Sequence, residues 1–260
     1  MKMPIALSIA GVDPSGGAGI FADIKTFSAF RVYGMGVVTA LTSQNTYEVN
    51  GIKTAGRKFF QKQINTVLKD IKPDSVKTGM IPDIVTADVI YESLMEHKLN
   101  NLVIDPVMIS KQGAFLSSRS TIRFIIKKLF PLSLIITPNI PEASYISGIK
   151  IKNVEDMISA CKKISRLGPK NVLLKGGHME GDVCVDVLFD GKKIFYFKNK
   201  RIKTKNTHGT GCTLSAAICA NLSKGKKLLD SVEIAINYVN KAIRKSLDIG
   251  KGNGPLNHMP

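Results

Sequence analysis

The feature of this sequence that most restricts its fold is the alternation of short, β-rich apolar runs with longer segments of helical period. The predicted strands are the runs at 5–9, 36–41, 75–78, 102–104, 134–136 and 172–174. The predicted helices are a segment ending near residue 30, those at 59–71, 84–97, 120–129 and 154–167, and one that begins after 139–142. This order is typical of an α/β protein in which helices connect the strands of a mainly parallel sheet.

The last third of the chain adds a hairpin and two helices. Asp190-Gly191, a strong hairpin signal, separates apolar runs at 183–189 and 194–197. The segment 213–222 carries an apolar helical stripe, and the final helix places four apolar residues on one face: Val232, Ile236, Val239 and Ile243. Because no repeat, low-complexity segment or linker interrupts the pattern, we expect a single domain spanning residues 1–260.

Composition narrows the class of protein. No apolar run reaches the ~18 residues that a membrane span requires, and the first residues lack the long apolar stretch of a signal peptide. The four cysteines form no CxxC pair and no cluster with histidines, so neither a disulfide framework nor a zinc site is indicated. We therefore expect a cytoplasmic protein with no membrane partner.

The chain is strongly basic, with 37 Lys and Arg against 20 Asp and Glu and a net charge of +17. Such a balance is compatible with nucleic-acid binding through phosphate contacts. The lysines are scattered, however, and the densest clusters, at 127–128, 198–205 and 224–227, contain no interleaved aromatic ladder. A solvated lysine-rich surface that attracts anionic substrates is the favoured interpretation, and no nucleic-acid partner is expected.

Two glycine-rich loops stand far apart in the sequence. The loop at 11–19 follows a predicted strand and precedes a helix, so its amides could bind an anion, although it is neither a Walker A loop nor a GxGxxG fingerprint. Its glycines could equally serve only a tight turn. The loop at 206–212 ends in Cys212 and leads into the helix at 213–222. At that helix N-terminus, free amides and the helix dipole could stabilise a transferring phosphoryl group and favour a Cys212 thiolate. Taken alone, Cys212 is better explained as a small packed cysteine at a helix start.

Eight motifs distributed along nearly the whole chain, in one order, carry a resemblance. They are IAGVDPSGGAG at 9–19, TALTSQNT at 39–46, KTGM at 77–80, DPVM at 105–108, TPN at 137–139 with Glu142, LKGGH at 174–178, NTHGTGC at 206–212 and GNGPLNH at 252–258. On these motifs the sequence resembles the hydroxymethylpyrimidine/phosphomethylpyrimidine kinases of thiamine biosynthesis. The resemblance implies a ribokinase-like three-layer α/β/α sandwich with a mainly parallel central sheet.

The resemblance also implies the reaction. ATP would phosphorylate 4-amino-5-hydroxymethyl-2-methylpyrimidine and then its monophosphate, with Mg²⁺ accompanying ATP, and the enzyme would be a homodimer. Gln44 falls where the family reads the pyrimidine, and its amide can both donate to and accept from an aminopyrimidine edge. The remaining residues expected to bind the substrate are Gly11, Asp13, Ala18, Met80 and Val107.

The same resemblance assigns the phosphoryl-transfer end. Cys212 would accept the proton of the substrate hydroxyl while amides of Gly209, Thr210 and Gly211 hold the γ-phosphoryl group. Asp105 and Glu142 would lie on the magnesium side, and three residues would face the nucleotide: Asn139, Lys175 and Thr207. An unperturbed cysteine, with a pKa of ~8.5, would need help to act as a base at neutral pH.

Three alternatives remain open from the sequence. A pyridoxal or pyridoxine kinase of the same superfamily would share the phosphate machinery, and Gln44 alone does not settle ring selectivity. A nucleic-acid-binding protein would explain the charge but not the motifs. A ribokinase-like protein without activity would not require the complete set of site residues.

Overall fold

The structure is a computed structural model that describes residues 2–108 and 116–260. Its centre is a sheet of nine strands in the order β3-β2-β1-β4-β5-β6-β7-β8-β9. The strands are β1 (Ile5–Val12), β2 (Tyr33–Gln44), β3 (Val49–Thr54), β4 (Ser75–Thr78), β5 (Leu102–Ile104), β6 (Ile135–Ile136), β7 (Val172–Leu174), β8 (Val183–Phe189) and β9 (Ile194–Lys200). The six neighbouring strands β2-β1-β4-β5-β6-β7 pair in parallel. At the two edges of the sheet, β3, β8 and β9 pair antiparallel with their neighbours.

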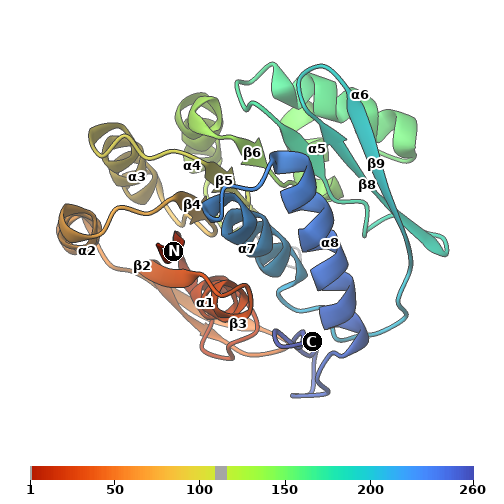
Figure 1. Cartoon of the computed structure of the whole chain (residues 1–260), viewed down its shortest axis with the longest axis horizontal. Coiled ribbons are helices and arrows are strands. Elements are labelled where there is room, and N and C mark those ends of the chain that lie inside the picture. The colour runs from red at the N-terminus through yellow and green to blue at the C-terminus, as the bar shows by residue number, and fades with distance from the viewer. Residues whose placement is uncertain (1, 109–115) are drawn as a thin grey trace.

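Helices cover both faces of this sheet (Figure 1). One face packs against α2 (Arg57–Asp70), α3 (Ile84–Glu96), α4 (Arg119–Phe124), α5 (Ile140–Ser147) and α6 (Val154–Ser165). The other packs against α1 (Gly19–Ala29), α7 (Thr210–Ser223) and α8 (Leu228–Arg244). The expected three-layer α/β/α sandwich is confirmed.

The local sequence explains these layers. The central strands β4, β5 and β7 are buried on both faces, as expected for parallel strands between two helical layers. Along α8, Val232, Ile236 and Val239 are buried at the spacing seen in the sequence, so this helix presents one apolar face to the interior, where it packs on α7. The helix α7 is buried almost throughout, because it lies between the sheet and α8.

The structure departs from the sequence-based expectation in three places. The edge strand β3 was not expected, because most of its residues are polar or exposed and no apolar run marks it. The helix expected at 120–129 passes from α4 into a π-helical turn, Ile125–Leu129. Finally, α7 begins at Thr210 rather than after Cys212.

No helix among the described residues has both the length and the apolar character needed to cross a bilayer.

Candidate active site

The carboxyl ends of the parallel strands meet at one edge of the sheet, where open α/β folds bind their ligands. There β1 runs into the loop at 11–19, β5 is followed by Asp105, and β7 is followed by Lys175. A cavity of about 720 Å³ opens at this edge and extends from Gln44 to the start of α7. Its volume is in the range of small-ligand sites. All the site residues expected from the sequence line this cavity: Gly11, Asp13, Ala18, Gln44, Met80, Asp105, Val107, Asn139, Glu142, Lys175, Thr207, Gly209, Thr210, Gly211 and Cys212.

Asp13 joins the two glycine-rich loops. One of its carboxylate oxygens accepts hydrogen bonds from the Ser15 amide (2.9 Å) and hydroxyl (2.7 Å), and the other accepts one from the Ala18 amide (2.9 Å). That second oxygen also lies 2.7 Å from Nε2 of His208, 195 positions later in the chain. Burial favours a higher pKa for Asp13, but the hydrogen bonds from His208 and Ser15 outweigh it and hold the pKa below its ordinary value. One oxygen thus fixes the first loop and the other joins it to the second, a role that the sequence did not suggest.

The loops also approach each other through their backbones. Gly209 precedes the first residue of α7 with φ of 82°, in the left-handed region that favours glycine. A Cβ on Gly209 would overlap the carbonyl oxygen of Gly17. The two glycines therefore allow the first loop to pack directly against the helix N-terminus.

The first turn of α7 can supply amides for an anion, and one of the three amides expected from the sequence, that of Thr210, already has a partner. The amide and hydroxyl of Thr210 both donate to the carbonyl oxygen of Thr207, at 3.3 and 2.8 Å. Since Thr210 already has this partner, the amides of Gly211 and Cys212 are better placed to hold a ligand, because the first helical amides lack partners inside the helix. The helix dipole adds partial positive charge at the same point.

Lys175 and Asp105 form an ion pair above this turn. Lys175 Nζ lies 2.9 Å from Asp105 Oδ1, which also accepts a hydrogen bond from the Thr137 hydroxyl at 3.2 Å. A Cβ on Gly211 would lie 3.2 Å from Lys175 Nζ, so the ammonium group sits directly against the helix start. Burial opposes the charge of Asp105, but Lys175 and Lys77 outweigh it and lower the pKa of this carboxyl. The pair therefore brings one cation and one anion to the helix N-terminus.

Glu142 and Asn139 cap α5 reciprocally. The amide of Glu142 donates to Oδ1 of Asn139 (2.9 Å), and the amide of Asn139 donates to Oε2 of Glu142 (2.8 Å). Burial raises the pKa of Glu142 to about 7, with Lys175 opposing the rise and Asp105 adding to it. Glu142 is thus a carboxyl that changes charge near neutral pH.

The Cys212 thiol is not the low-pKa group expected from its place at a helix N-terminus. Burial raises its pKa to about 11; the positive charge of Lys77 opposes this rise, whereas the carboxylates of Asp105 and Asp23 add to it. The expectation of a favoured thiolate is therefore wrong for this structure. Desolvation is the largest cause of the shift, and the two nearby carboxylates add to it.

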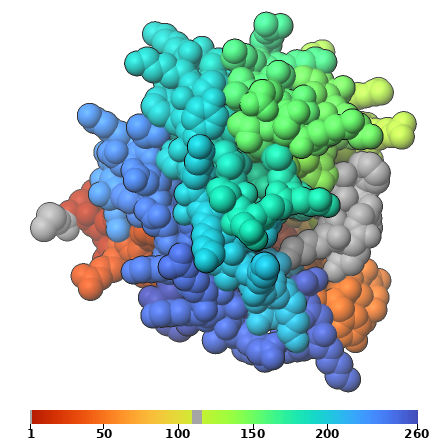
Figure 2. All heavy atoms as spheres, turned by 90° about the vertical axis from the view of Figure 1, so that its right-hand side faces the viewer, coloured from red at the N-terminus to blue at the C-terminus, as the bar shows by residue number. Residues whose placement is uncertain are grey.

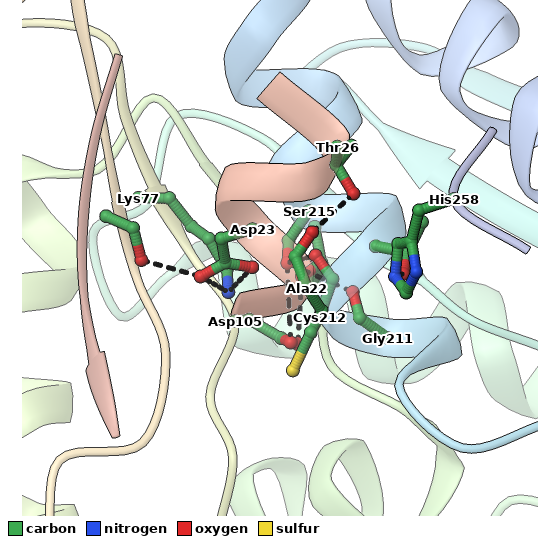
Figure 3. A network of polar contacts seen from close by, with 12 residues as sticks. Ala22, Asp23, Thr26, Lys77, Asp105, Gly211, Cys212, Ser215 and His258 are labelled. Carbon is green, nitrogen blue, oxygen red and sulfur yellow. Dashed lines mark hydrogen bonds and ion pairs between the residues drawn. The ribbon is translucent and has the colours of Figure 1, made fainter. Parts of the chain in front are cut away.

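A buried ion pair that the sequence analysis missed lies beside Cys212. Lys77, in the middle of β4, and Asp23, on the buried face of α1, are both fully buried. In Figure 3 this pair lies on one side of Asp105 and Cys212, while His258 lies on the other side. A signal was present, because a lysine in a short central strand needs a buried partner, and Asp23 lies between Ile20 and Phe27 at helical spacing.

Gln44 stands at the other end of the cavity. Its Oε1 lies 3.2 Å from the Thr42 hydroxyl, which in turn lies 2.8 Å from the carbonyl oxygen of Val12. Nearby, a Cβ on Gly11 would lie 2.8 Å from Cε of Met80, so the thioether packs directly on this glycine. An amide group and an apolar wall are thus brought together here.

The carboxylates of the cavity decide whether this site fits the Mg²⁺ ion that the sequence leads us to expect. Among residues 2–108 and 116–260, no group of three or more His, Cys, Asp and Glu side chains forms a ready-made metal site. Magnesium typically binds to one or two carboxylates together with water and substrate phosphates. Asp105 and Glu142 at the cavity wall fit that requirement.

Comparison with known proteins gives a consistent result. A family model described as phosphomethylpyrimidine kinase matches residues 13–257. The chain is 43% identical over 260 residues, 99% of its length, to a hydroxymethylpyrimidine/phosphomethylpyrimidine kinase of Staphylococcus aureus, covering 94% of that protein. It is 46% identical over 257 residues, 98% of its length, to a probable thiamine biosynthetic bifunctional enzyme of Oryza sativa subsp. japonica, and spans only 47% of that longer protein. A crystal structure of an ADP complex of Bacillus subtilis pyridoxal kinase superposes with a TM-score of 0.91 at 37% identity, covering 99% of this chain and 98% of the other.

Proposed function

The chain belongs to the phosphomethylpyrimidine kinase family, and from this premise we propose how its residues transfer a phosphoryl group from ATP to a small aminopyrimidine. The enzyme phosphorylates 4-amino-5-hydroxymethyl-2-methylpyrimidine and its monophosphate in thiamine biosynthesis. One observation supports this function most directly: a single cavity connects the Gln44 amide with the N-terminus of α7 and the Lys175–Asp105 pair.

The helix start is the centre of the transfer. The amides of Gly211 and Cys212, with Gly209 and Thr210 shaping the turn, hold the oxygens of the transferring group. Lys175 adds a positive charge at the same point, because its Nζ lies against Gly211. Phosphoryl transfer depends chiefly on positioning and electrostatic stabilisation, which these groups supply in a partly buried site.

Cys212 is the base that we assign to the substrate hydroxyl. Its thiol follows the two amides in the first turn of α7 and lines the cavity. Because its pKa is raised to about 11, only a small fraction is thiolate at neutral pH. The contribution of the base to the rate is therefore proportional to that fraction. The amides supply the larger share of the stabilisation of the transferring phosphoryl group.

The acceptor end reads the ring. Gln44 donates to and accepts from the aminopyrimidine edge, while Gly11, Ala18, Met80 and Val107 form the surrounding wall. Asp13 contributes by fixing the loop that carries Ala18. The hydroxymethyl arm then points along the cavity towards Cys212.

The nucleotide end holds ATP and its magnesium ion. Asp105 and Glu142 would bind the ion directly or through water, and the bound ion would neutralise charge on the phosphates. Asn139, Lys175 and Thr207 face the phosphates. Lys175 would be drawn between Asp105 and the phosphate, since a lysine acts as a mobile point charge.

Pyridoxal is the competing acceptor, because the Bacillus subtilis structure at 37% identity is of a pyridoxal kinase. The test is a comparison of kcat/KM for the pyrimidine alcohol and for pyridoxal, measured by coupled ADP release with saturating MgATP. We expect the larger value for the pyrimidine alcohol and a diphosphate product by mass spectrometry. A larger value for pyridoxal would reassign the enzyme, and turnover of neither alcohol would reject a kinase of either kind.

Two further properties are part of the proposal. We place the enzyme in the cytoplasm as a single-domain chain that forms a homodimer. Light scattering of the purified protein tests the dimer.

A further inference from the structure

The last residues of the chain return to the active site. We call Gly250–His258 the C-terminal tail; it contains the GNGPLNH motif, which the reaction proposed above leaves without a role. Figure 1 shows the C-terminus beside the end of α8 and the β2–β3 region. Figure 2 shows the dark-blue C-terminal region at the surface, near the orange segment around residue 50 and the cyan segment around residue 200. Sequence segments from three parts of the chain thus converge there.

One part of the tail binds the connection between β2 and β3, which follows Gln44 and which we call the acceptor loop. The amide of Gly252 donates to the Thr46 hydroxyl at 3.0 Å, and the amide of Asn253 donates to the Thr46 carbonyl oxygen at 3.0 Å. Thr46 lies two residues after Gln44, in the connection between β2 and β3. The tail therefore fixes the backbone of the segment that carries the ring-reading amide.

The following part of the tail binds the loop that leads into α7. The His208 amide donates to the Gly254 carbonyl oxygen at 3.1 Å, and the Gly254 amide donates to Asn206 Oδ1 at 3.2 Å. His258 Nε2 lies 3.1 Å from the hydroxyl of Thr213, the residue directly after Cys212. These contacts hold both ends of the loop at 206–212.

The tail itself is anchored in the molecule. Leu256 is buried in the interior with 1% exposure, and the amide of Asn257 donates to the carbonyl oxygen of Ala242 at 3.2 Å. The Tyr238 hydroxyl on α8 donates to the His258 carbonyl oxygen at 2.6 Å. Because the tail is fixed to α8 in this way and is bonded to both loops, it can hold the two loops in a fixed position relative to each other.

The packing of the tail depends on glycine. A Cβ on Gly252 would overlap the Thr46 carbonyl oxygen and lie 2.7 Å from Cβ of Tyr47. Gly252 does not have a positive φ, so its requirement is one of space rather than of backbone conformation. Asn253, the next residue, lines the cavity. The close approach of tail and acceptor loop therefore forms part of the cavity wall.

From these contacts we propose that the C-terminal tail is a positioning element of the active site. It fixes the position of the acceptor loop relative to the loop at 206–212. Gln44, which binds the ring of the acceptor, and the phosphoryl-transfer centre lie on different loops, and the tail is bonded to both loops. Misplacing reacting groups by about 1 Å can cost ~10²-fold in rate. The inference rests on the proposed function, since it concerns the same two ends of that cavity.

The first experiment is Gly252→Ala, compared with Gly51→Ala in β3. The added Cβ at Gly51 would make only one ordinary contact, with Cβ of Ser43 at 3.8 Å, and Gly51 does not line the cavity. We expect Gly252→Ala to raise the KM for the pyrimidine alcohol and to lower kcat/KM by up to ~10²-fold. The KM for ATP and all constants of Gly51→Ala should remain near wild type. A fall in kcat no larger than the unfolded fraction measured by circular dichroism, with the KM for the alcohol unchanged, would overturn the proposal.

The second experiment tests whether a change in the loop at 206–212 affects the acceptor loop through the tail. Asn206→Ala removes the acceptor of the Gly254 amide, whereas Asn206→Asp keeps an oxygen in that place. We expect Asn206→Ala to raise the KM for the alcohol and to speed hydrogen exchange in the segment 44–54, and Asn206→Asp to restore both. Exchange that changes only around 206–213 would overturn the proposal. Hydrogen exchange needs no turnover, so it remains decisive even if the wild-type enzyme phosphorylates a different alcohol.

Discussion

The ammonium group of Lys77 lies 2.7 Å from both carboxylate oxygens of Asp23, and neither side chain is exposed to solvent. The Ser8 hydroxyl donates to the same carboxylate at 2.6 Å. Burial disfavours the charge of Lys77, but Asp23 is so close that the pKa of the lysine is nevertheless raised. The pair thus joins β4 to α1 as two buried, mutually neutralising charges beside Cys212.

Removing one member of this pair should cost more than removing both. Lys77→Met leaves the carboxylate of Asp23 buried and unpaired, and we expect it to lower the free energy of unfolding by about 3–5 kcal/mol. Urea denaturation followed by circular dichroism measures this difference. The double variant Lys77→Met with Asp23→Leu should recover most of the loss. Equal stability of the single and double variants would show that the two charges do not depend on each other.

The sequence predicted the interior of this fold better than its edges. Strands such as β4 and β5 are buried on both faces, so their apolar character marks them directly. The edge strand β3 has polar and exposed residues, and only its pairing with β2 makes it a strand. Its position depends on tertiary contacts that no local pattern encodes.

For the candidate site, the location of the residues was predictable from the sequence, whereas their electrostatic environment was not. Motifs placed Gln44, Asp105, Lys175 and Cys212 at one cavity, because each ends or follows a strand, or lies in the first turn of a helix, at the same edge of the sheet. The electrostatic state of Cys212 was not predictable in this way. Its pKa depends on burial and on charges from β4, α1 and the end of β5, which are distant in sequence. Contacts over such distances, including His208 with Asp13, arise only from the folded chain.

The role of Cys212 as a base predicts an alkaline pH dependence. Because its pKa is raised to about 11, the thiolate fraction rises about tenfold per pH unit below that value. We expect kcat for the pyrimidine alcohol to rise with pH between about 7 and 9, and Cys212→Ala to lower kcat by ~10²–10⁴ and to lose this rise. Steady-state kinetics across that range measures both. A flat wild-type profile with near-normal turnover of Cys212→Ala would assign the transfer to the α7 amides without a thiolate.

Gln44 should affect the acceptor and not the nucleotide. Gln44→Ala removes both the donor and the acceptor at the ring edge, and the loss of one hydrogen bond of about 1 kcal/mol corresponds to roughly fivefold in KM for the pyrimidine alcohol. Gln44→Glu keeps the size of the side chain but replaces its NH2 donor with an acceptor. We expect both variants to raise the KM for the alcohol and to leave the KM for ATP near wild type in initial-rate measurements. Equal changes in the two KM values would contradict a ring-reading role.

Glu142 should give the enzyme an acid limb in its pH profile. The pKa of this carboxyl is raised to about 7, so the side chain is neutral below that value and anionic above it. If the anion supports the magnesium side of ATP, kcat/KM for ATP should fall as the pH decreases from about 7 to 5.5. This range is separate from the alkaline rise assigned to Cys212.

The variant Glu142→Gln isolates the charge from the helix cap. A glutamine can still accept the hydrogen bond from the Asn139 amide, so α5 should remain capped and the free energy of unfolding near wild type. We expect kcat/KM for ATP to fall by ~10–100-fold, as when a partner of a metal site is lost, and the acid limb to disappear. Glu142→Ala removes the cap as well and should lower stability by about 1 kcal/mol in addition. Because the two variants share the loss of charge and differ in the cap, an acid limb that persists in Glu142→Gln would assign the titration to a different group.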